Sequence, residues 1–331
     1  MSKYLQIDRP EVAGTGEPRR VGFELEFSGL SLDEVCAALA QSLGGDVQQL
    51  SRMESVVSVD ELGDFNVELD WQLGKVIARQ RQQDGKGTDD DDLLMDWIRD
   101  IASEIVPAEV VCPPIPLPAL DQLEPMTAAL REAGAVGTHG APYYAFGVHI
   151  NPELPDLEAA TIVAYLQAFC LAQKWLVKAH KVDLSRRITP YIDLYPDRYV
   201  ARVLAYDQDT SLAQVMADYL EHNPSRNRAL DLLPLFRYLD EERLVAAIDD
   251  ERIKARPTFH YRLPNCSIER ADWSLSQSWN IWCVIESLAH NSELVASMAQ
   301  QWLARDEALI NLDEPPWHRQ LDELLDDLLS G

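Results

Sequence analysis

Alternating apolar and polar residues over 19–30 mark the first β-strand that the chain predicts. The sequence there is RRVGFELEFSGL, and its apolar positions are Val21, Phe23, Leu25 and Phe27. A period of two residues is typical of a strand with one buried face. The other face carries two carboxylates, Glu24 and Glu26, which therefore lie on the same side of the predicted sheet.

A helix follows at residues 31–45. Ser31 and Glu34 form a capping box, the apolar residues after them recur with a helical period, and Gly44–Gly45 ends the helix. The sequence therefore predicts a strand and a helix in succession at the start of the folded region.

The segment 54–73 predicts a pair of strands around a turn at Gly63–Asp64. In the second of these strands Glu68 and Asp70 share one face, with apolar side chains on the other. The opening pattern of two acids opposite an apolar face is thus repeated.

Two more strands carry polar groups. A short strand bears Glu109 and is stopped by the prolines that follow it. In the strand 144–151, His149 projects from the same side as Gly147 and Asn151, and the small glycine is expected to leave open space beside the imidazole.

Helices are predicted between and after the strands. They span about 93–105, 120–133, 156–181 with Asp156 as its cap, short segments within 211–255, 274–303 and 318–330. A final strand region, 257–273, is broken at Pro264. Strands concentrated in the first half with helices around them predict an α+β fold, an antiparallel sheet backed by helices.

The acidic composition restricts the partners. The 331 residues carry a formal net charge of −26, which argues against nucleic acid and anionic membrane surfaces. The start of the chain has no apolar core typical of a signal peptide, and the apolar run 159–173 is expected to be a buried helix. Five cysteines without metal-site spacing indicate reduced thiols, and we expect a cytoplasmic protein.

The polar segment 81–92, RQQDGKGTDDDD, is expected to be an exposed loop. It has neither the order of a phosphate-binding loop nor the spacing of a calcium loop, and its aspartates suit a helix N-terminus. This loop and the Arg- and Tyr-rich segment 185–199 are two candidate lids, a hypothesis that limited proteolysis with and without nucleotide tests.

Several ionisable groups on strand faces converge if the strands share one sheet. Those expected at a metal site are Glu24, Glu26, Glu68, Glu109, His149 and Glu269. Clustered carboxylates raise one another's pKa values, and a divalent metal removes that repulsion. Oxygen ligands with one imidazole suit Mg²⁺ or Mn²⁺, whereas zinc more often has cysteine or several histidines.

These motifs together resemble one family. VGFELEF, a later Glu-bearing strand, AEVVCPPIP, YAFGVHINPE and SIERADW occur in this order over about residues 19–303, and the set resembles the amidoligase family of the glutamine synthetase and glutamate–cysteine ligase superfamily. The resemblance implies a glutamine synthetase-like sheet that binds ATP and two or three Mg²⁺ or Mn²⁺ ions. It also implies a reaction in which a carboxylate takes the γ-phosphate and an amine then displaces phosphate.

The resemblance also implies roles for individual residues. Glu24 and Glu26 would bind different metals, Glu68 or Glu109 or both would complete one site, and His149 with Glu269 the other. Residues implied at the nucleotide or the reacting phosphate are Arg262, Arg270, Arg186, Arg187 and Asn151. In the superfamily the late strand often has Glu and Arg two residues apart on one face, but Glu269 and Arg270 are adjacent and would point to opposite faces. Arg262, Arg186 or Arg187 is the alternative source of the phosphate contact.

The resemblance divides the chain into a flexible N-terminal segment (1–18), a catalytic domain (19–305) with a helical insertion at about 205–256, and an acidic helical tail (306–331). The expected activity is ATP-dependent ligation of a small-molecule or peptide carboxylate to an amine. The alternatives are a kinase of small molecules, a non-catalytic binding relative, and a two-metal hydrolase.

Overall fold

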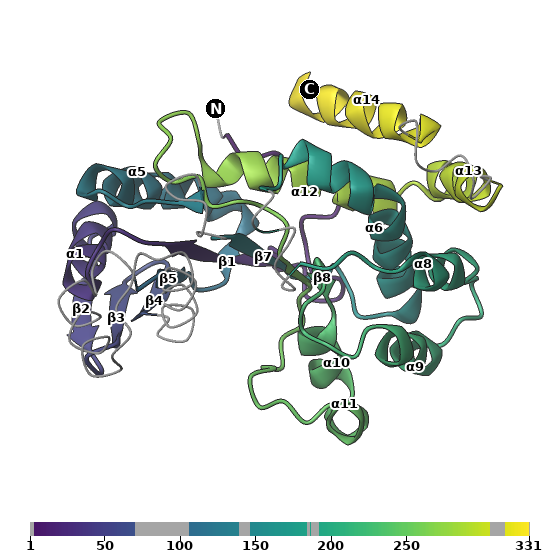
Figure 1. Cartoon of the computed structure of the whole chain (residues 1–331), viewed down its shortest axis with the longest axis horizontal. Helices are drawn as coiled ribbons and strands as arrows, with labels where there is room; N and C mark the ends of the chain where they lie inside the picture. The colour runs from purple at the N-terminus through teal and green to yellow at the C-terminus, as the bar shows by residue number, and fades with distance from the viewer. Residues whose placement is uncertain are drawn as a thin grey trace, which may run out of the picture.

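The fold is known from a computed structural model that describes residues 3–69, 106–138, 146–183, 186, 192–304 and 315–330 (Figure 1). The helix predicted at 93–105 and the polar loop at 81–92 lie outside the described residues, and so do Asp70 and Arg187. The second candidate lid, 185–199, is described only at Arg186 and from 192 onward.

The described strands form one antiparallel sheet of nine strands, in the order β2-β3-β4-β5-β1-β7-β9-β8 with β6 beside β1. Their bounds are β1 (Arg20–Phe27), β2 (Asp46–Gln49), β3 (Glu54–Val59), β4 (Gly63–Leu69), β5 (Ala108–Val111), β6 (Ile115–Pro116), β7 (Val148–Pro152), β8 (Leu230–Asp231) and β9 (His260–Tyr261). The α+β class predicted from the sequence is therefore confirmed.

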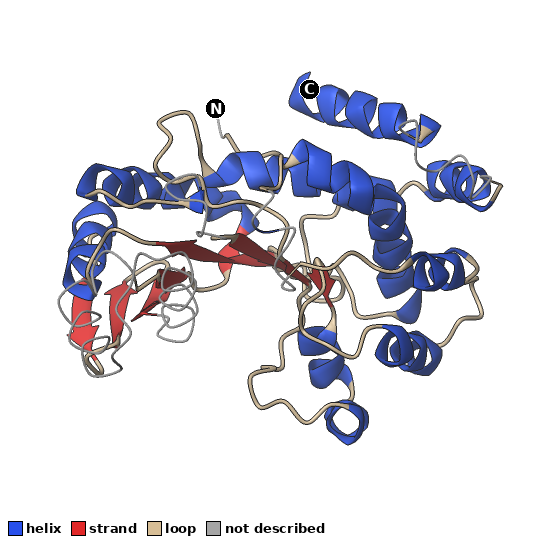
Figure 2. Cartoon of the chain, in the orientation of Figure 1, coloured by secondary structure: helices blue, strands red, loops and turns tan. Residues whose placement is uncertain are grey.

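The helices pack on the sheet and on one another. They are α1 (Leu32–Leu43), the 3₁₀ helix η1 (Leu117–Leu123), α5 (Glu124–Ala133), α6 (Ala159–Ala179), α8 (Asp197–Leu204), α9 (Leu212–His222), α10 (Leu233–Leu239), α11 (Glu241–Ala247), α12 (Leu275–Ala289), α13 (Ser292–Leu303) and α14 (Pro316–Ser330). Figure 2 shows α5, α12 and α6 along one side of the sheet, with α10 and α11 beyond its opposite side.

The core lies between the sheet and this helical layer. All four apolar side chains of β1 predicted to face it, from Val21 to Phe27, are fully buried. Burying one side chain of this size stabilises a fold by roughly 1.5–3 kcal/mol. Because side chains alternate along a strand, this burial turns Glu24 and Glu26 toward the opposite face.

A buried ion pair joins the residue before β1 to the helical layer. Arg19 donates to both carboxylate oxygens of Glu286 on α12, at 2.9 and 2.8 Å. Tyr165 of α6 and Trp282 of α12 also donate to this carboxylate. Burial alone would raise the pKa of Glu286, but Arg19 and these hydrogen bonds outweigh burial and hold the pKa below its ordinary value.

The long apolar helix predicted inside the core is α6. Its length and composition would allow it to cross a membrane, but 67% of its most apolar stretch is buried within the protein. All five cysteines are buried and unpaired, as expected from their spacing. The N-terminal segment expected to be flexible packs here too, because Tyr4 is buried and the Leu5 carbonyl accepts a hydrogen bond from Trp279.

Several predicted boundaries are wrong. The turn after β3 lies at 60–62 and not at Gly63–Asp64, because Gly63 already pairs with Val59. The helix predicted from 156 begins at Ala159, with Glu158 as its N-cap residue.

The helix predicted over 274–303 is two helices. The Asn291 side chain accepts a hydrogen bond from the Leu294 N–H and thereby starts α13 as a separate helix. The strand predicted through SIERADW is also wrong, since Ile268 and Glu269 form a turn and regular pairing ends at Tyr261.

The predicted helical insertion, about 205–256, contains α9, α10 and α11 but also a strand. Strand β8 pairs with β9, so that Asp231 lies opposite His260 at the edge of the sheet. The insertion therefore supplies a side chain to the polar face as well as helices.

Candidate functional site

The polar face of the sheet carries a row of carboxylates in register. Glu26 of β1 lies opposite Glu109 of β5, and Glu109 lies opposite Glu68 of β4. Two residues earlier on β1, Glu24 lies opposite His149 of β7. The convergence of strand-borne acids and one histidine that the sequence predicts is thus present in the fold.

One group of side chains on this face consists of Glu24, His149 and His260. The Nδ1 atom of His149 is 2.9 Å from Glu24 Oε2, and the Nε2 atom of His260 is 3.5 Å from the same oxygen. The two imidazole rings meet edge to face with centroids 5.0 Å apart. All three residues are buried, and their potential ligand atoms lie close enough to hold one metal ion.

The second group consists of Glu26, Glu109 and His149. The Nε2 atom of His149 is 3.7 Å from Glu26 Oε1, while the other oxygen of Glu26 accepts a hydrogen bond of 2.7 Å from the Gly147 amide. His149 therefore belongs to both groups, one ring nitrogen facing Glu24 and the other facing Glu26.

Three arginines surround these groups. Arg256, on the loop before β9, lies with Nη1 2.9 Å from Glu24 Oε1, and Asn151 donates to the same oxygen at 2.9 Å. Arg262 places Nη2 3.2 Å from His260 Nδ1. Because each guanidinium carries fixed positive charge and several donors, this edge of the site is suited to phosphate.

The third arginine, Arg186, is fixed by the backbone. Its guanidinium donates to the carbonyls of Arg262, Leu263 and Pro264 and lies against Gly147. A side chain at position 147 would clash with it, so the space expected beside His149 is filled by this guanidinium. Burial lowers the pKa of Arg186 to about 10, which still leaves it cationic at neutral pH.

Burial sets the protonation states of the site. Burial alone would raise the pKa of Glu24, but the imidazoles of His260 and His149 outweigh it and hold the pKa well below its ordinary value. Burial and then Arg262 lower the pKa of His260 to about 3, so this imidazole is neutral at neutral pH. Arg256, whose guanidinium lies 2.9 Å from Glu24 Oε1, places a positive charge beside this carboxylate.

Buried polar atoms without a hydrogen bond gather on this face. Within the described part of the chain they include His260 Nε2, Asn151 Oδ1, Asp231 Oδ2 and Arg262 Nε. Leaving such atoms unpaired costs free energy unless a water, ion or ligand meets them. Together with the carboxylates, these atoms fit a site for divalent metal and a polar ligand.

Of the residues predicted from the sequence, the structure brings together Glu24, Glu26, Glu109, His149, Asn151, Arg262 and Arg186. Glu68 stands opposite Glu109 in register but is in neither group. Its role as a ligand stays a prediction, and Arg187 lies outside the described residues.

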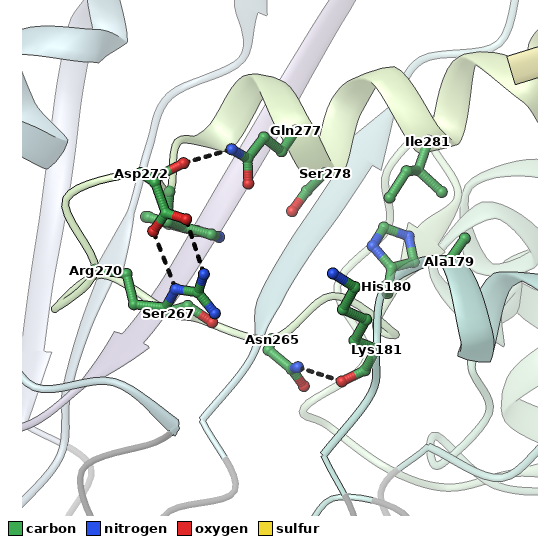
Figure 3. A pocket seen from close by; sticks show the side chains of 11 residues that line it. Ala179, His180, Lys181, Asn265, Ser267, Arg270, Asp272, Gln277, Ser278 and Ile281 are labelled. Carbon is green, nitrogen blue, oxygen red and sulfur yellow. Dashed lines mark hydrogen bonds and ion pairs between the residues drawn. The ribbon is translucent and has the colours of Figure 1, made fainter. Parts of the chain in front are cut away.

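Glu269 and Arg270 are in neither group, and the role of Glu269 as a metal ligand stays a prediction. Glu269 accepts a hydrogen bond of 3.0 Å from the Gly137 amide, and exposed Arg270 pairs with Asp272 at 2.8 Å. Arg270 lines a cavity of about 320 Å³ between the end of α6 and the start of α12, shown in Figure 3 with Asn265 and Lys181. No residue lining that cavity belongs to either carboxylate–histidine group.

Three residues of the site were not predicted from the sequence: His260, Arg256 and Asp231. His260 and Arg262 occupy alternate positions around Tyr261, so their side chains share the polar face. Strand β9 itself ends at Tyr261, and Arg262 is the residue directly after it. The period of two that identified Glu24 could have found His260, whereas no local pattern distinguishes Arg256.

Comparison with known proteins identifies the family of the chain. No curated protein matches the sequence significantly. A family model described as "putative amidoligase enzyme" matches residues 17–284, which is most of the chain and includes every strand of the sheet. The chain therefore belongs to the amidoligase family.

Proposed function

We propose that this protein is an ATP-dependent ligase that joins a carboxylate to an amine through an acyl phosphate. The observation that carries the proposal is the pair of carboxylate–histidine groups that share His149 on one sheet face. Membership of the amidoligase family supports the ligase class. The proposal includes a glutamine synthetase-like use of this sheet face, with ATP and Mg²⁺ or Mn²⁺ as cofactors.

In the proposed reaction a substrate carboxylate oxygen attacks the γ-phosphorus of ATP, and ADP leaves. The amine then attacks the acyl carbon, the C–O bond to phosphate breaks, and a proton is lost from nitrogen. Divalent ions bound at this face neutralise charge on the phosphate oxygens.

The arginines take complementary roles in this proposal. Arg262 lies beside the first group and carries an unpaired Nε–H, which offers a donor to phosphate. Arg256 reaches Glu24 with a side chain that is 40% exposed, so it can turn from this carboxylate to an anionic ligand. Arg186 is held by carbonyls and contributes a fixed positive charge beside Glu26.

Calorimetry with a non-hydrolysable ATP analogue and Mg²⁺ or Mn²⁺ tests the nucleotide site without knowledge of the substrates. We expect metal-dependent binding that weakens at least tenfold in Glu26→Gln. The matched control is Glu54→Gln, an exposed glutamate of β3 at the far end of the same row. Absence of binding to the wild type at millimolar nucleotide, or equal weakening in the control, contradicts the proposal.

Product analysis separates the ligase from its rivals. Release of ADP that needs both a carboxylate and an amine identifies a ligase. ADP release with carboxylate alone, accumulating a stable phosphorylated product, indicates a kinase. Metal-dependent cleavage of an amide without ATP indicates a two-metal hydrolase.

A further inference from the structure

His260 changes the chemistry of one of the two groups. Glu24, His149 and His260 offer one carboxylate and two imidazoles, whereas Glu26 and Glu109 offer oxygen alone beside the shared histidine. Mg²⁺ selects oxygen ligands and retains bound water, but imidazole nitrogen suits Zn²⁺ and other late first-row ions. The nitrogen-rich group therefore does not fit the Mg²⁺ that the family resemblance implies.

The separations of the donor atoms suit a single small ion. Two atoms each ~2.1 Å from a shared ion lie ~3.0 Å apart at a right angle and ~3.4 Å apart at a tetrahedral angle. Glu24 Oε2 is 2.9 Å from His149 Nδ1 and 3.5 Å from His260 Nε2. The three ligand atoms all lie within 4.8 Å of one another, and three protein ligands leave a position open for water or substrate.

The surroundings of His260 favour ligation through Nε2. This buried atom makes no hydrogen bond and faces Glu24. The opposite nitrogen, Nδ1, lies 3.9 Å from Asp231 Oδ2, a buried carboxylate oxygen without a hydrogen bond that also forms an ion pair with Arg262 at 3.6 Å. When Nε2 binds a metal, Nδ1 carries the hydrogen and Asp231 can accept it, in place of the present contact from Arg262.

We propose that Glu24, His149 and His260 bind Zn²⁺, and that Asp231 is a positioning residue that orients His260. His149 then binds through Nδ1, and its Nε2–H turns toward Glu26. The neighbouring pair, Glu26 and Glu109, remains a site of oxygen ligands for Mg²⁺ or Mn²⁺. The two sites of one sheet face thus hold different metals.

The test uses chelator-treated full-length protein without nucleotide, titrated with Co²⁺, whose visible absorption reports its coordination in a zinc site. We expect stoichiometric binding that Zn²⁺ displaces and millimolar Mg²⁺ does not. In His260→Glu, which replaces imidazole by carboxylate, Co²⁺ affinity falls at least tenfold and Mg²⁺ becomes a competitor. The matched control is His222→Gln, a histidine at the end of α9 outside both groups.

Unchanged Co²⁺ affinity in His260→Glu, or displacement of Co²⁺ from the wild type by Mg²⁺, overturns the proposal. Should His260→Glu fail to fold, X-ray absorption at the zinc edge of the wild type determines how many imidazoles bind the ion. Scattering from two imidazoles supports the site, and scattering from one or none overturns it. Asp231→Asn tests the positioning role separately, with an expected loss of about 10- to 100-fold in Co²⁺ affinity, and an unchanged affinity excludes that role.

This inference deepens the proposed function, because it concerns the same sheet face, but its test is independent of ligation. Binding of Co²⁺ through His260 without any ATP-dependent product would support the zinc site and contradict the proposed ligase activity. Binding of ATP and Mg²⁺ together with unchanged Co²⁺ affinity in His260→Glu would support the nucleotide site of the proposed ligase and contradict the zinc site.

Discussion

Two buried carboxylates on opposite faces of the sheet show how differently one protein treats a buried charge. Glu286, under the helices, accepts hydrogen bonds from Arg19, Tyr165 and Trp282, and none of these four side chains has an unpaired polar atom. Glu24, on the polar face, is also partnered, but unpaired atoms of other side chains surround it. The hydrogen bonds of the first carboxylate are all made within the protein. The second carboxylate belongs to a site whose unpaired polar atoms are suited to a bound ion or ligand.

Breaking the Arg19–Glu286 pair should produce the largest loss of stability. Glu286→Gln leaves a buried guanidinium without its counter-charge, which costs about 3–5 kcal/mol in comparable pairs. Urea unfolding of this variant and of Glu24→Gln measures the contrast. We expect a smaller change for Glu24→Gln, because the glutamine oxygen can still accept from Asn151 and Arg256. Equal losses in the two variants would refute the distinction.

Acid should break the same pair without mutation. The pKa of Glu286 is lowered in the folded protein, so its contribution to stability is fully present above its unfolded value of 4.5. That contribution is lost as the pH falls through the lowered folded value. Urea midpoints between pH 7 and strong acid should therefore fall less steeply in Glu286→Leu paired with Arg19→Met than in the wild type. Parallel pH profiles would show that other groups control acid unfolding.

Divalent metal should stabilise the polar face and leave the buried pair unaffected. An ion at one hundred times its dissociation constant stabilises the folded state by about 2.7 kcal/mol. We expect Zn²⁺ to raise the melting temperatures of the wild type and of Glu286→Gln, and to stabilise the two folded proteins by similar free energies. Glu24→Gln should lose most of this response. A full response in Glu24→Gln would place the metal elsewhere.

Arg256 should have the smallest effect, and on nucleotide rather than metal. Arg256→Met removes one charge-assisted contact worth about 1.5 kcal/mol or less at this partly exposed position, so we expect an affinity for the ATP analogue that is weaker by up to about tenfold. Arg256→Lys should recover part of that loss. Arg252→Met, which removes an exposed arginine paired with Asp250, is the matched control. Stronger nucleotide binding in Arg256→Met would show that this arginine blocks the nucleotide site in the free protein.

Local patterning predicted those parts of the fold that depend on residues close in sequence. The capping box at Ser31 and the alternation in β1 specify their elements directly, and both are present. The break between α12 and α13 was missed although residues 290–293 are all polar, and the cap at Asn291 starts α13 within this polar stretch. Strand β8 is two residues long, which is too short for any period to show.

The site was predictable where a strand carries its own signal. Glu24, Glu26 and His149 stand out because each alternates with apolar neighbours on a strand of five residues or more. His260 lies on a two-residue strand, and its neighbour along the face, Arg262, lies beyond it. Asp231 and Arg256 reach the face only through the register of β8 and the course of a loop, which depend on tertiary packing.

The place of His149 between Glu24 and Glu26 has a thermodynamic consequence. A neutral imidazole has a single lone pair, so an ion that takes it leaves the other group facing an N–H donor. Occupancy of one site must therefore alter the affinity of the other, and by the same factor in either direction. The order in which the two ions are loaded would then be a property of one side chain.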